Sequence, residues 1–521
     1  MEQEKANSGK AKKRLSRFLF SRIGIILLLI ILQIGILVAS TKCFQQYMLY
    51  VHGGMTLLGT IVVIAIINSE GNPAFKMTWM LCVMASPPIG TLAYLYVKMQ
   101  FGTRWMGKRL AALKEETSPY MVQDPDIVHD LRASKPANAN LSHYLSEQME
   151  FPMYRNTEVT YFPLGEDKFE AMLREIASAK KFIFMEYFII ERGIMWDTIL
   201  DLLEKKAKEG VEIRVMYDGM CAISKLPYDY PKEVQKRGIQ CKMAIPIKPF
   251  LSTVQNNRDH RKICVIDGRV GFTGGVNLGD EYINKIERFG HWKDTAIMLE
   301  GDAVQSLTMM FLEMWNVDER RPEQYEKYLT SKVPRFYKER GYVLPYADSP
   351  FDNENVGEEV YFHILNHSKQ YVHIMTPYLI LDNEMITTLT RTAKSGIEVI
   401  IIMPHIPDKW YAFVLAKTYY KELLKAGVQI YEYTPGFVHA KVFISDDDTA
   451  TVGTINLDYR SLYLHFECGV MIYNNVVVDK IEEDFQETLG KCQKITLQDV
   501  KDRSAMTKIA GEVLKLFAPL M

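Results

Sequence analysis

The sequence predicts an α/β protein with a body of two similar halves related by pseudo-two-fold symmetry, each a mixed sheet flanked by helices, preceded by N-terminal transmembrane helices. Three observations lead to this prediction. Uncharged apolar stretches gather in the first hundred residues. A strand–helix–strand pattern then occurs twice in the remainder of the chain, and the same polar motif follows each copy. The apolar stretches indicate membrane helices, and the duplicated pattern indicates the two halves.

The composition is that of a folded protein. The 521 residues are 48% hydrophobic and 24% charged, which excludes a disordered or collagen-like chain. Lys and Arg number 62 against 63 Asp and Glu, so no bulk positive charge points to a nucleic-acid partner. The seven cysteines are odd in number and form no C-x-x-C pair, which argues against a disulfide scaffold and against a zinc ribbon.

The first predicted element is a membrane region at 23–97, behind a basic leader at 1–22. Its first stretch, 23–40, has eighteen residues without a charge, close to the length that spans a bilayer as a helix. This run is longer than the apolar core of a signal peptide, and two further stretches follow it at 51–68 and 77–97. We therefore expect a retained anchor of two to three segments.

Positive charges flank this region on both sides and give conflicting signals about its topology. Lys and Arg are frequent in the leader and again at 98–114, and both clusters favour the cytoplasmic side. Three full spans would separate them, so either one segment is re-entrant, with a break at Gly53-Gly54 or Pro87-Pro88, or one cluster lies outside. We expect a multi-pass protein of the cell membrane with its globular part in the cytoplasm.

The body of the chain follows as a duplicated pattern. In each copy a buried-strand pattern precedes a helical stretch, a glycine that stops the helix, and a second strand with a continuous apolar run. The segments are 181–190, 195–209 and 211–218 in the first copy, and 370–380, 383–395 and 397–404 in the second. Proline-rich stretches suggest connectors, so we divide the chain into a linker at 98–150, a first half at 151–320 and a second half at 321–521.

Each half then carries one polar motif. Four positions recur 179 residues apart, in segments that otherwise differ. Residues two apart in a strand share a face, so the His and Lys of each copy are expected to point the same way. The Asp would end the strand in a turn, and the following glycine-containing turn would bring the Asn back beside the His and Lys. The residues are His260, Lys262, Asp267 and Asn277 in the first copy, and His439, Lys441, Asp446 and Asn456 in the second.

These side chains suit phosphodiester transfer without a metal ion. One neutral imidazole can attack phosphorus to form a phosphohistidine, and the other, protonated, can donate to the leaving oxygen. Lys262 and Lys441 would neutralise the phosphate oxygens, with Asn277 and Asn456 as further phosphate contacts. Two imidazoles that differ in protonation need partners on their second nitrogens. Asp294, 34 residues after His260, and Glu467, 28 after His439, are the candidates.

The doubled H-x-K-x4-D followed by G-x-x-N resembles the phospholipase D superfamily. The segments TPYLILDNEM, MPHIPDKWYAF, GFVHAKVFI and VGTINLDYRSLYLHFE of the second half, and NNRDHRKICVIDGRVGFTGGVNL of the first, are similar to bacterial cardiolipin synthases. The similarity covers roughly residues 75 to 516 and includes NPAFKMTWML.

The resemblance implies two phospholipase D-like repeats and a phosphatidyltransferase in the bacterial plasma membrane. Such an enzyme makes cardiolipin from two phosphatidylglycerol molecules and releases glycerol. The resemblance favours His260 as the nucleophile and His439 as the general acid and base. It lists Asp267 and Asp446 with the active-site residues, although their place at the far end of each strand suits a supporting role. No cofactor, no metal and no nucleic-acid partner are expected.

Alternatives stay open at this point. The same chemistry would serve a phospholipase D-type hydrolase, in which water replaces the acceptor alcohol, or a nuclease acting on nucleic acid. A scaffold with an inactive site is disfavoured by two intact motifs. His291, His405 and His465 could line a substrate channel, whereas Cys264 reads as a core residue. The aromatic residues from Trp410 to Tyr420 could equally face a membrane or pack a helix.

Overall fold

The computed structural model describes residues 31, 35, 48–99, 101–246, 256–329 and 341–520. These fall into two compact units. Residues 48–99 lie in the smaller unit, and almost all the other described residues after 101 lie in the larger one.

The smaller unit contains three helices, α3 (Met48–Ile67), α4 (Pro73–Ala85) and α5 (Pro87–Met99), which contact one another. The predicted stretch 51–68 falls in α3, which runs through Gly53-Gly54 without a break. The stretch 77–97 is not one helix: it is divided at Ser86 between α4 and α5, at the Pro87-Pro88 break that the sequence allowed. Pro87 has no N–H with which to continue α4 and instead starts α5.

The three helices share a small apolar core. Val62, Ile66, Val83 and Tyr94 are buried in it. On the other side of α3, a row of apolar side chains is exposed: Leu57, Leu58, Ile61, Ile64 and Ile67. Within the part of the chain that the structure describes, no helix combines the length and apolar character needed to cross a membrane. The leader at 1–22 and, apart from residues 31 and 35, the stretch 23–40 lie outside the described residues.

The larger unit begins with helices where the sequence suggested a linker. The helices are α6 (Phe101–Thr117), η1 (Ser118–Tyr120), α7 (Pro125–Ser134), α8 (Pro136–His143) and η2 (Tyr144–Gln148). Pro125 and Pro136 occupy the first turns of α7 and α8, where a missing N–H costs nothing. Leu113 and Leu131 are fully buried. Two prolines of the predicted linker therefore start helices that pack within this unit.

The first half contains a seven-stranded mixed sheet with the strand order β1-β9-β7-β6-β2-β3-β4. β2, β3 and β4 pair in parallel, and the other neighbours pair antiparallel. The predicted strands and helix are β2, α10 and β3. The bounds are β1 Thr157–Phe162, β2 Phe182–Tyr187, β3 Glu212–Asp218, β4 Gln240–Ala244, β6 Lys262–Ile266, β7 Val270–Gly274 and β9 Ala296–Gly301.

The second half repeats this sheet. The order β10-β19-β17-β16-β11-β13-β14 matches the first sheet strand for strand, and β20 is added at the far edge. The predicted second copy is β11, α15 and β13, and Gly396 follows α15 with a positive φ, as Gly210 follows α10. The bounds are β10 Tyr342–Asp348, β11 Tyr371–Met375, β13 Glu398–Pro404, β14 Gln429–Tyr433, β16 Val442–Ser445, β17 Thr449–Gly453, β19 His465–Tyr473 and β20 Cys492–Ile495.

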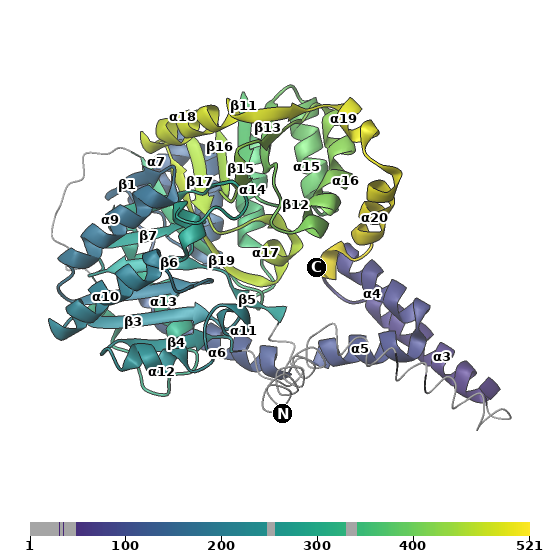
Figure 1. Ribbon diagram of the computed structural model, residues 1–521, viewed down its shortest axis with the longest axis horizontal. Helices are drawn as coiled ribbons and strands as arrows, with labels where there is room; N and C mark the ends of the chain where they lie inside the picture. Colours follow the sequence, from purple (N-terminus) through teal and green to yellow (C-terminus); the bar gives the residue numbers. More distant parts are fainter. Residues whose placement is uncertain are drawn as a thin grey trace, which may run out of the picture. The chain divides into compact units, whose positions relative to one another are not determined.

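Helices cover both sheets (Figure 1). In the first half these are α9 (Gly165–Ser178), α10 (Ile194–Lys208), α11 (Cys221–Ser224), α12 (Tyr230–Gln235) and α13 (Val304–Asn316). In the second they are α14 (Val356–His367), α15 (Asn383–Lys394), α16 (Trp410–Ala426), α17 (Tyr459–Tyr463), α18 (Val477–Leu489), α19 (Leu497–Asp502) and α20 (Ala505–Lys515). Short 3₁₀ segments are η4 (Asp280–Ile283), η5 (Tyr325–Tyr328) and η6 (Ala518–Leu520). Residues 330–340, between the two halves, lie outside the residues that the structure describes.

The halves meet along the antiparallel strands of both sheets. β7 contacts β17 and β19, and β9 contacts β17. Three short strands complete the joint: β5 (Arg258–Asp259), β8 (His291–Lys293) and β15 (Gly436–Val438). Within the second half, β12 (Leu379–Ile380) pairs β18 (Leu457–Asp458). β5 and β15 pair with strands of the opposite half, and each leads directly into one of the two motifs.

Candidate active site

The two histidines stand just before the inner strands of the sheets. β6 begins at Lys262 and β16 at Val442, so the apolar run after each motif becomes a fully buried strand. His260, Lys262, His439 and Lys441 are all buried. Lys262 Nζ donates to the carbonyl of His260 at 2.5 Å, and Lys441 Nζ donates in the same way to the carbonyl of His439. Each lysine thus lies against its own histidine.

Both histidines are held by backbone bonds to the opposite half. The N–H of His260 donates to the carbonyl of Phe466 in β19 at 2.9 Å. The N–H of His439 donates to the carbonyl of Lys293 in β8 at 2.7 Å. The strands that join the two halves therefore also hold the two histidines in place.

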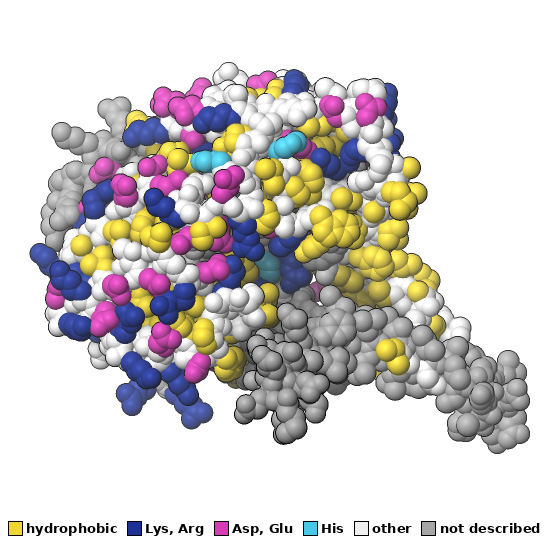
Figure 2. Space-filling model, in the orientation of Figure 1, with side chains coloured by type: hydrophobic (Ala, Val, Ile, Leu, Met, Phe, Trp, Pro, Cys, Tyr) yellow, Lys and Arg dark blue, Asp and Glu magenta, His cyan; other side chains and the backbone are white. Residues whose placement is uncertain are grey.

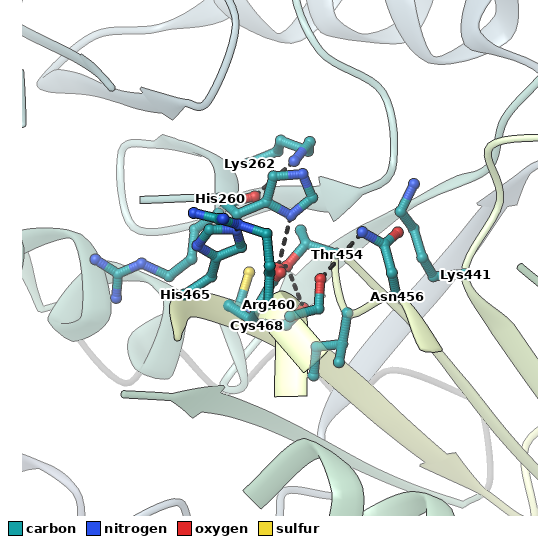
Figure 3. Close-up of polar contacts among 12 residues, drawn as sticks. His260, Lys262, Lys441, Thr454, Asn456, Arg460, His465 and Cys468 are labelled. Atoms are coloured by element: carbon teal, nitrogen blue, oxygen red, sulfur yellow. Dashed lines mark hydrogen bonds and ion pairs between the residues drawn. The ribbon is translucent and has the colours of Figure 1, made fainter. Parts of the chain in front are cut away.

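The two carboxylates cross between the halves. Nδ1 of His260 lies 2.9 Å from Oε2 of Glu467 (Figure 3). Nδ1 of His439 lies 2.7 Å from Oδ2 of Asp294. The sequence spacing associated each carboxylate with the histidine of its own half, and this pairing is wrong. Because β5 and β15 pair with strands of the opposite half, each histidine instead meets the carboxylate of that half. With Nδ1 engaged, Nε2 is the nitrogen left to face a phosphate.

The surroundings of the carboxylates differ between the halves at one matched position. A Cβ built on Gly275 would lie 1.9 Å from Oδ1 of Asp294, so only glycine leaves room for this carboxylate. The residue 179 positions later is Thr454, and its hydroxyl donates to Oε2 of Glu467. Glu467 therefore receives a hydroxyl donor that Asp294 lacks at the equivalent position.

Burial and neighbouring charges shift the site's pKa values in different directions. Burial raises the pKa of Glu467 to about 8, although Lys262 and the Thr454 hydroxyl oppose this. Burial also acts on Asp294, but His439 and Lys441 outweigh it and hold its pKa below the usual value. At neutral pH Glu467 therefore keeps its proton and Asp294 does not.

The four basic groups have lowered pKa values. Burial and Lys441 lower the pKa of His439 to about 4, against the pull of Asp294. Burial and then Lys262 lower the pKa of His260 well below its usual value. Burial lowers the pKa of Lys262 to about 8 and that of Lys441 to about 7. The empty site thus favours neutral imidazoles, and an anion placed between the four groups would raise all four pKa values.

Asp267 and Asp446 do not join this cluster. The carboxylate of Asp267 accepts backbone N–H bonds from residues 180, 181 and 182, at 2.7–2.9 Å. Asp446 does the same with residues 369, 370 and 371, at 2.7–3.1 Å. Both have a positive φ and end β6 and β16. Each ties the far end of a motif strand to the start of its neighbour, which fits the supporting role that their place in the strand suggested.

The two asparagines form hydrogen bonds with neighbouring segments of the protein. Oδ1 of Asn277 accepts the N–H of Ile189 at 3.0 Å, and its Nδ2 donates to Tyr282 at 2.9 Å. Nδ2 of Asn456 donates to Ser461 at 3.0 Å, while its Oδ1 is buried without a hydrogen-bond partner among the described residues. With both ends of its amide engaged, Asn277 does not fit the expected role of phosphate contact. Its bonds instead tie the segment after β2, at Ile189, to η4, at Tyr282.

One supporting network was missed from the sequence. Behind His260, Arg261 forms an ion pair with the fully buried Glu186 of β2 at 2.6 Å and lies 3.4 Å from Asp259. A Glu inside the otherwise apolar run of 181–190 was the available signal, because a buried carboxylate requires a partner.

Rings surround both imidazoles. Phe188 contacts His260 edge-on, and His465 stacks on it at a centroid distance of 5.9 Å. Tyr282 and Trp292 lie beside His439, at 5.7 and 5.4 Å. Of the three histidines noted as channel candidates, His465 therefore touches the site directly.

The remaining candidates have other roles. His291 contacts Tyr433, and His405 contacts Glu432. Cys264 is fully buried, as expected of a core residue. Trp410 and Tyr411 are exposed, whereas Tyr419 and Tyr420 are buried against neighbouring helices. Across the described ranges, no group of three or more His, Cys, Asp and Glu is arranged to hold a metal ion.

Comparison with known proteins agrees with this architecture. The family model of the cardiolipin synthase phospholipase D-like domain matches residues 172–315 and 361–489, one segment in each half. A cardiolipin synthase of Geobacillus sp. is 32% identical over 90% of this chain and 94% of its own. One of Halalkalibacterium halodurans is 30% identical over 96% of this chain and all of its own. A Streptococcus mutans protein without an assigned function is 51% identical over 88% of this chain and 99% of its own.

Among solved structures, phosphatidylserine synthase from Haemophilus influenzae matches with a TM-score of 0.57 at 16% identity. The match covers 74% of this chain and 97% of that one, and it supports the two-half fold. The paired motifs, the family model over both halves and the full-length relatives agree, and the chain therefore belongs to the cardiolipin synthase family of phospholipase D-like enzymes.

Proposed function

We propose that this enzyme is a membrane-bound phosphatidyltransferase that makes cardiolipin from two phosphatidylglycerol molecules and releases glycerol, through a phosphohistidine. The observation that carries the proposal is the crossed pair His260–Glu467 and His439–Asp294, with Lys262 and Lys441 beside it. Two imidazoles anchored at Nδ1 and two ammonium groups are the parts needed for double displacement at one phosphorus. The names of the relatives supply the lipid substrates.

In the first step, Nε2 of His260 attacks the phosphorus of one phosphatidylglycerol. The bond from phosphorus to the headgroup oxygen breaks, and protonated His439 gives its proton to that oxygen, so that glycerol leaves. His439 is then neutral. In the second step it takes the proton from the glycerol hydroxyl of another phosphatidylglycerol. That oxygen attacks the phosphohistidine, the N–P bond breaks, and His439 is again protonated while His260 is again neutral.

The two carboxyl groups support these roles. Asp294 is ionised, and a carboxylate at Nδ1 stabilises the imidazolium that His439 must form. Glu467 holds its proton, and a neutral partner favours the neutral imidazole that His260 needs as a nucleophile. The lysines would lie against the non-bridging oxygens, where their charge counts more because they are buried.

Membrane attachment would be supplied by the N-terminal region. The uncharged stretch 23–40 and the exposed apolar row of α3 support this part of the proposal. Substrates and anchor would then share one bilayer at the bacterial plasma membrane. The balanced net charge of −1 offers no general attraction for nucleic acid, which disfavours a nuclease.

Reconstitution of the full chain with phosphatidylglycerol tests the reaction. We expect cardiolipin and glycerol in equal amounts, and chelator should leave the rate unchanged. Phosphatidic acid as the only lipid product would identify a hydrolase and overturn the proposal. Nucleic acid cleaved in preference to lipid would do the same.

Trapping the intermediate tests the roles of the histidines. With labelled phosphatidylglycerol, His439→Gln should accumulate an acid-labile, base-stable labelled protein, whereas His260→Gln should give none. His367→Gln is the matched control, because His367 is exposed at the end of α14. Labelling of only the His260 variant would exchange the two roles.

A further inference from the structure

The two ends of the pseudo-symmetric site are chemically different. His465 begins β19 and pairs with Arg258, and the position 179 residues after Arg258 is Phe437, which pairs with Trp292. His465 at the His260 end therefore corresponds to Trp292 at the His439 end, and each ring lies beside its histidine. One end of the site has an imidazole where the other has an indole.

The difference extends to charge. Asn277 and Asn456 are equivalent, and each donates to the residue five positions later, Tyr282 or Ser461. The residues just before these two are Glu281 and Arg460. The pseudo-two-fold thus places an acidic residue at the His439 end and a basic one at the His260 end. Glu281 is buried near the cations of Lys225 and Arg288, at 3.9 and 3.4 Å.

Arg460 also sets the tautomer of His465. Its Nε–H points to Nε2 of His465 at 3.4 Å, and because a guanidinium is always a donor, Nε2 must accept. A neutral imidazole that accepts at Nε2 carries its proton on Nδ1. Nδ1 of His465 is buried and has no hydrogen-bond partner among the described residues. His465 therefore has an Nδ1–H donor without an acceptor among the described residues, and the positive charge of Arg460 lies beside its ring (Figure 3).

A buried donor without a partner is costly, and such groups in native proteins usually meet a ligand or water. The ligand must be an oxygen acceptor, and Arg460, together with Arg258 and Lys262, favours a negative charge. The view in Figure 2 shows a recessed histidine among Lys and Arg side chains on this face of the protein. The ring of His465 lies 5.9 Å from that of His260, so this unused donor adjoins the two-histidine centre.

We propose that Arg460 and His465 form a second phosphate subsite, which binds the phosphate of the acceptor lipid while the first phosphate occupies the two-histidine centre. This rests on the proposed function. Both phosphatidylglycerol and cardiolipin fit, because only the three carbons of one glycerol separate the attacking hydroxyl from the acceptor's own phosphate. Trp292 and Glu281 give the opposite end no comparable anion site, so the enzyme distinguishes a phosphorylated acceptor from a neutral one.

Two soluble acceptors that differ by one phosphate test this subsite. Full-length enzyme in vesicles of labelled phosphatidylglycerol is supplied with glycerol 3-phosphate or with glycerol, and transfer to each is measured as kcat/KM. We expect the wild type to favour glycerol 3-phosphate. His465→Phe, which removes the donor, should reduce this preference by about tenfold or more, the value of a charge-assisted hydrogen bond, through a higher KM for the phosphorylated alcohol.

Further variants show whether the loss of preference comes from the subsite itself. His465→Asn should restore much of the preference, because its amide nitrogen can lie where Nδ1 was. Arg460→Gln should reduce the preference, and His367→Phe, an exposed histidine, should not. Equal loss with both acceptors, or no loss of preference in His465→Phe and Arg460→Gln, would overturn the subsite.

Two controls distinguish a failure of the subsite from a failure of the proposed function. Inorganic phosphate should compete with glycerol 3-phosphate more weakly in His465→Phe than in the wild type if the subsite recognises phosphate itself; competition that is equal in both would count against it. Wild-type enzyme that yields no cardiolipin from phosphatidylglycerol alone refutes the proposed function. A wild type that makes cardiolipin but shows no preference between the two alcohols refutes only the subsite.

Discussion

Oδ2 of Asp294, in the first half, lies 2.7 Å from Nδ1 of His439, in the second. Replacing Asp294 with Asn keeps the shape but removes the negative charge, and an amide nitrogen turned towards Nδ1 would favour the wrong tautomer. We expect Asp294→Asn to lower kcat for cardiolipin formation about 10,000-fold, as for comparable His–Asp pairs, with little change in KM. Asp294→Glu should recover part of the rate. Activity within threefold of the wild type for Asp294→Asn would exclude this role.

Gly275 makes the contact between Asp294 and His439 possible. A Cβ at this position would lie 1.9 Å from Oδ1 of Asp294, so Gly275→Ala must displace the carboxylate from His439. We expect a loss of kcat comparable to that of Asp294→Asn. Gly210→Ala is the matched control: its φ of 89° makes alanine strained, but no atom lies within 4 Å. That variant should lose about 1 kcal/mol of stability and retain its kcat. Equal kcat in the two variants would contradict the argument.

Asp267 should behave as a structural residue. Its carboxylate satisfies three backbone N–H groups, which Asp267→Ala would leave without their acceptor. We expect a loss of about 2 kcal/mol or more in the free energy of unfolding, and a normal kcat per folded molecule. Denaturant titration together with active-site trapping separates the two quantities. A large fall in kcat with unchanged stability would instead place Asp267 in the reaction.

His439 makes stability depend on pH. Burial and Lys441 lower its pKa from an ordinary value near 6.5 to about 4, so the folded state binds this proton less tightly than the unfolded chain does. The stabilisation is present above pH 6.5 and is lost as the pH falls towards 4. From the two pKa values it amounts to about 3 kcal/mol. Denaturant titrations at pH 7.5 and 4.5 should show a smaller difference for His439→Gln than for the wild type, and equal differences would refute this assignment.

A buried ion pair also joins the halves. Lys293 Nζ lies 2.7 Å from Oδ2 of Asp484, which also accepts the hydroxyl of Tyr161 at 2.6 Å. Asp484→Leu would leave the ammonium buried and unpaired, and we expect a loss of about 3–5 kcal/mol in the free energy of unfolding. Adding Lys293→Met should restore much of it, because the orphaned charge is then gone. Additive losses in the double variant would mean that the pair is not coupled.

Much of the body could be predicted from the sequence because its strands are apolar on both faces. The runs 181–190 and 397–404 have no other stable place than inside a covered sheet. The exchange of Asp294 and Glu467 could not be predicted, because spacing along the chain does not record that β5 and β15 pair with strands of the opposite half. The helices at Pro125 and Pro136 could not be predicted for a related reason. In the sequence, a proline that starts a helix cannot be told from one in a linker, because the burial of the following turn is not known.

The crossed carboxylates have a consequence for folding of the protein during its synthesis. His260 leaves the ribosome 207 residues before Glu467, about 10–40 s earlier at common rates of synthesis. Throughout that interval the first half holds a nucleophile without its partner and lacks the acid, His439. A nascent or truncated chain therefore has only one of the two histidines, and the paired site is complete only when the last strands fold.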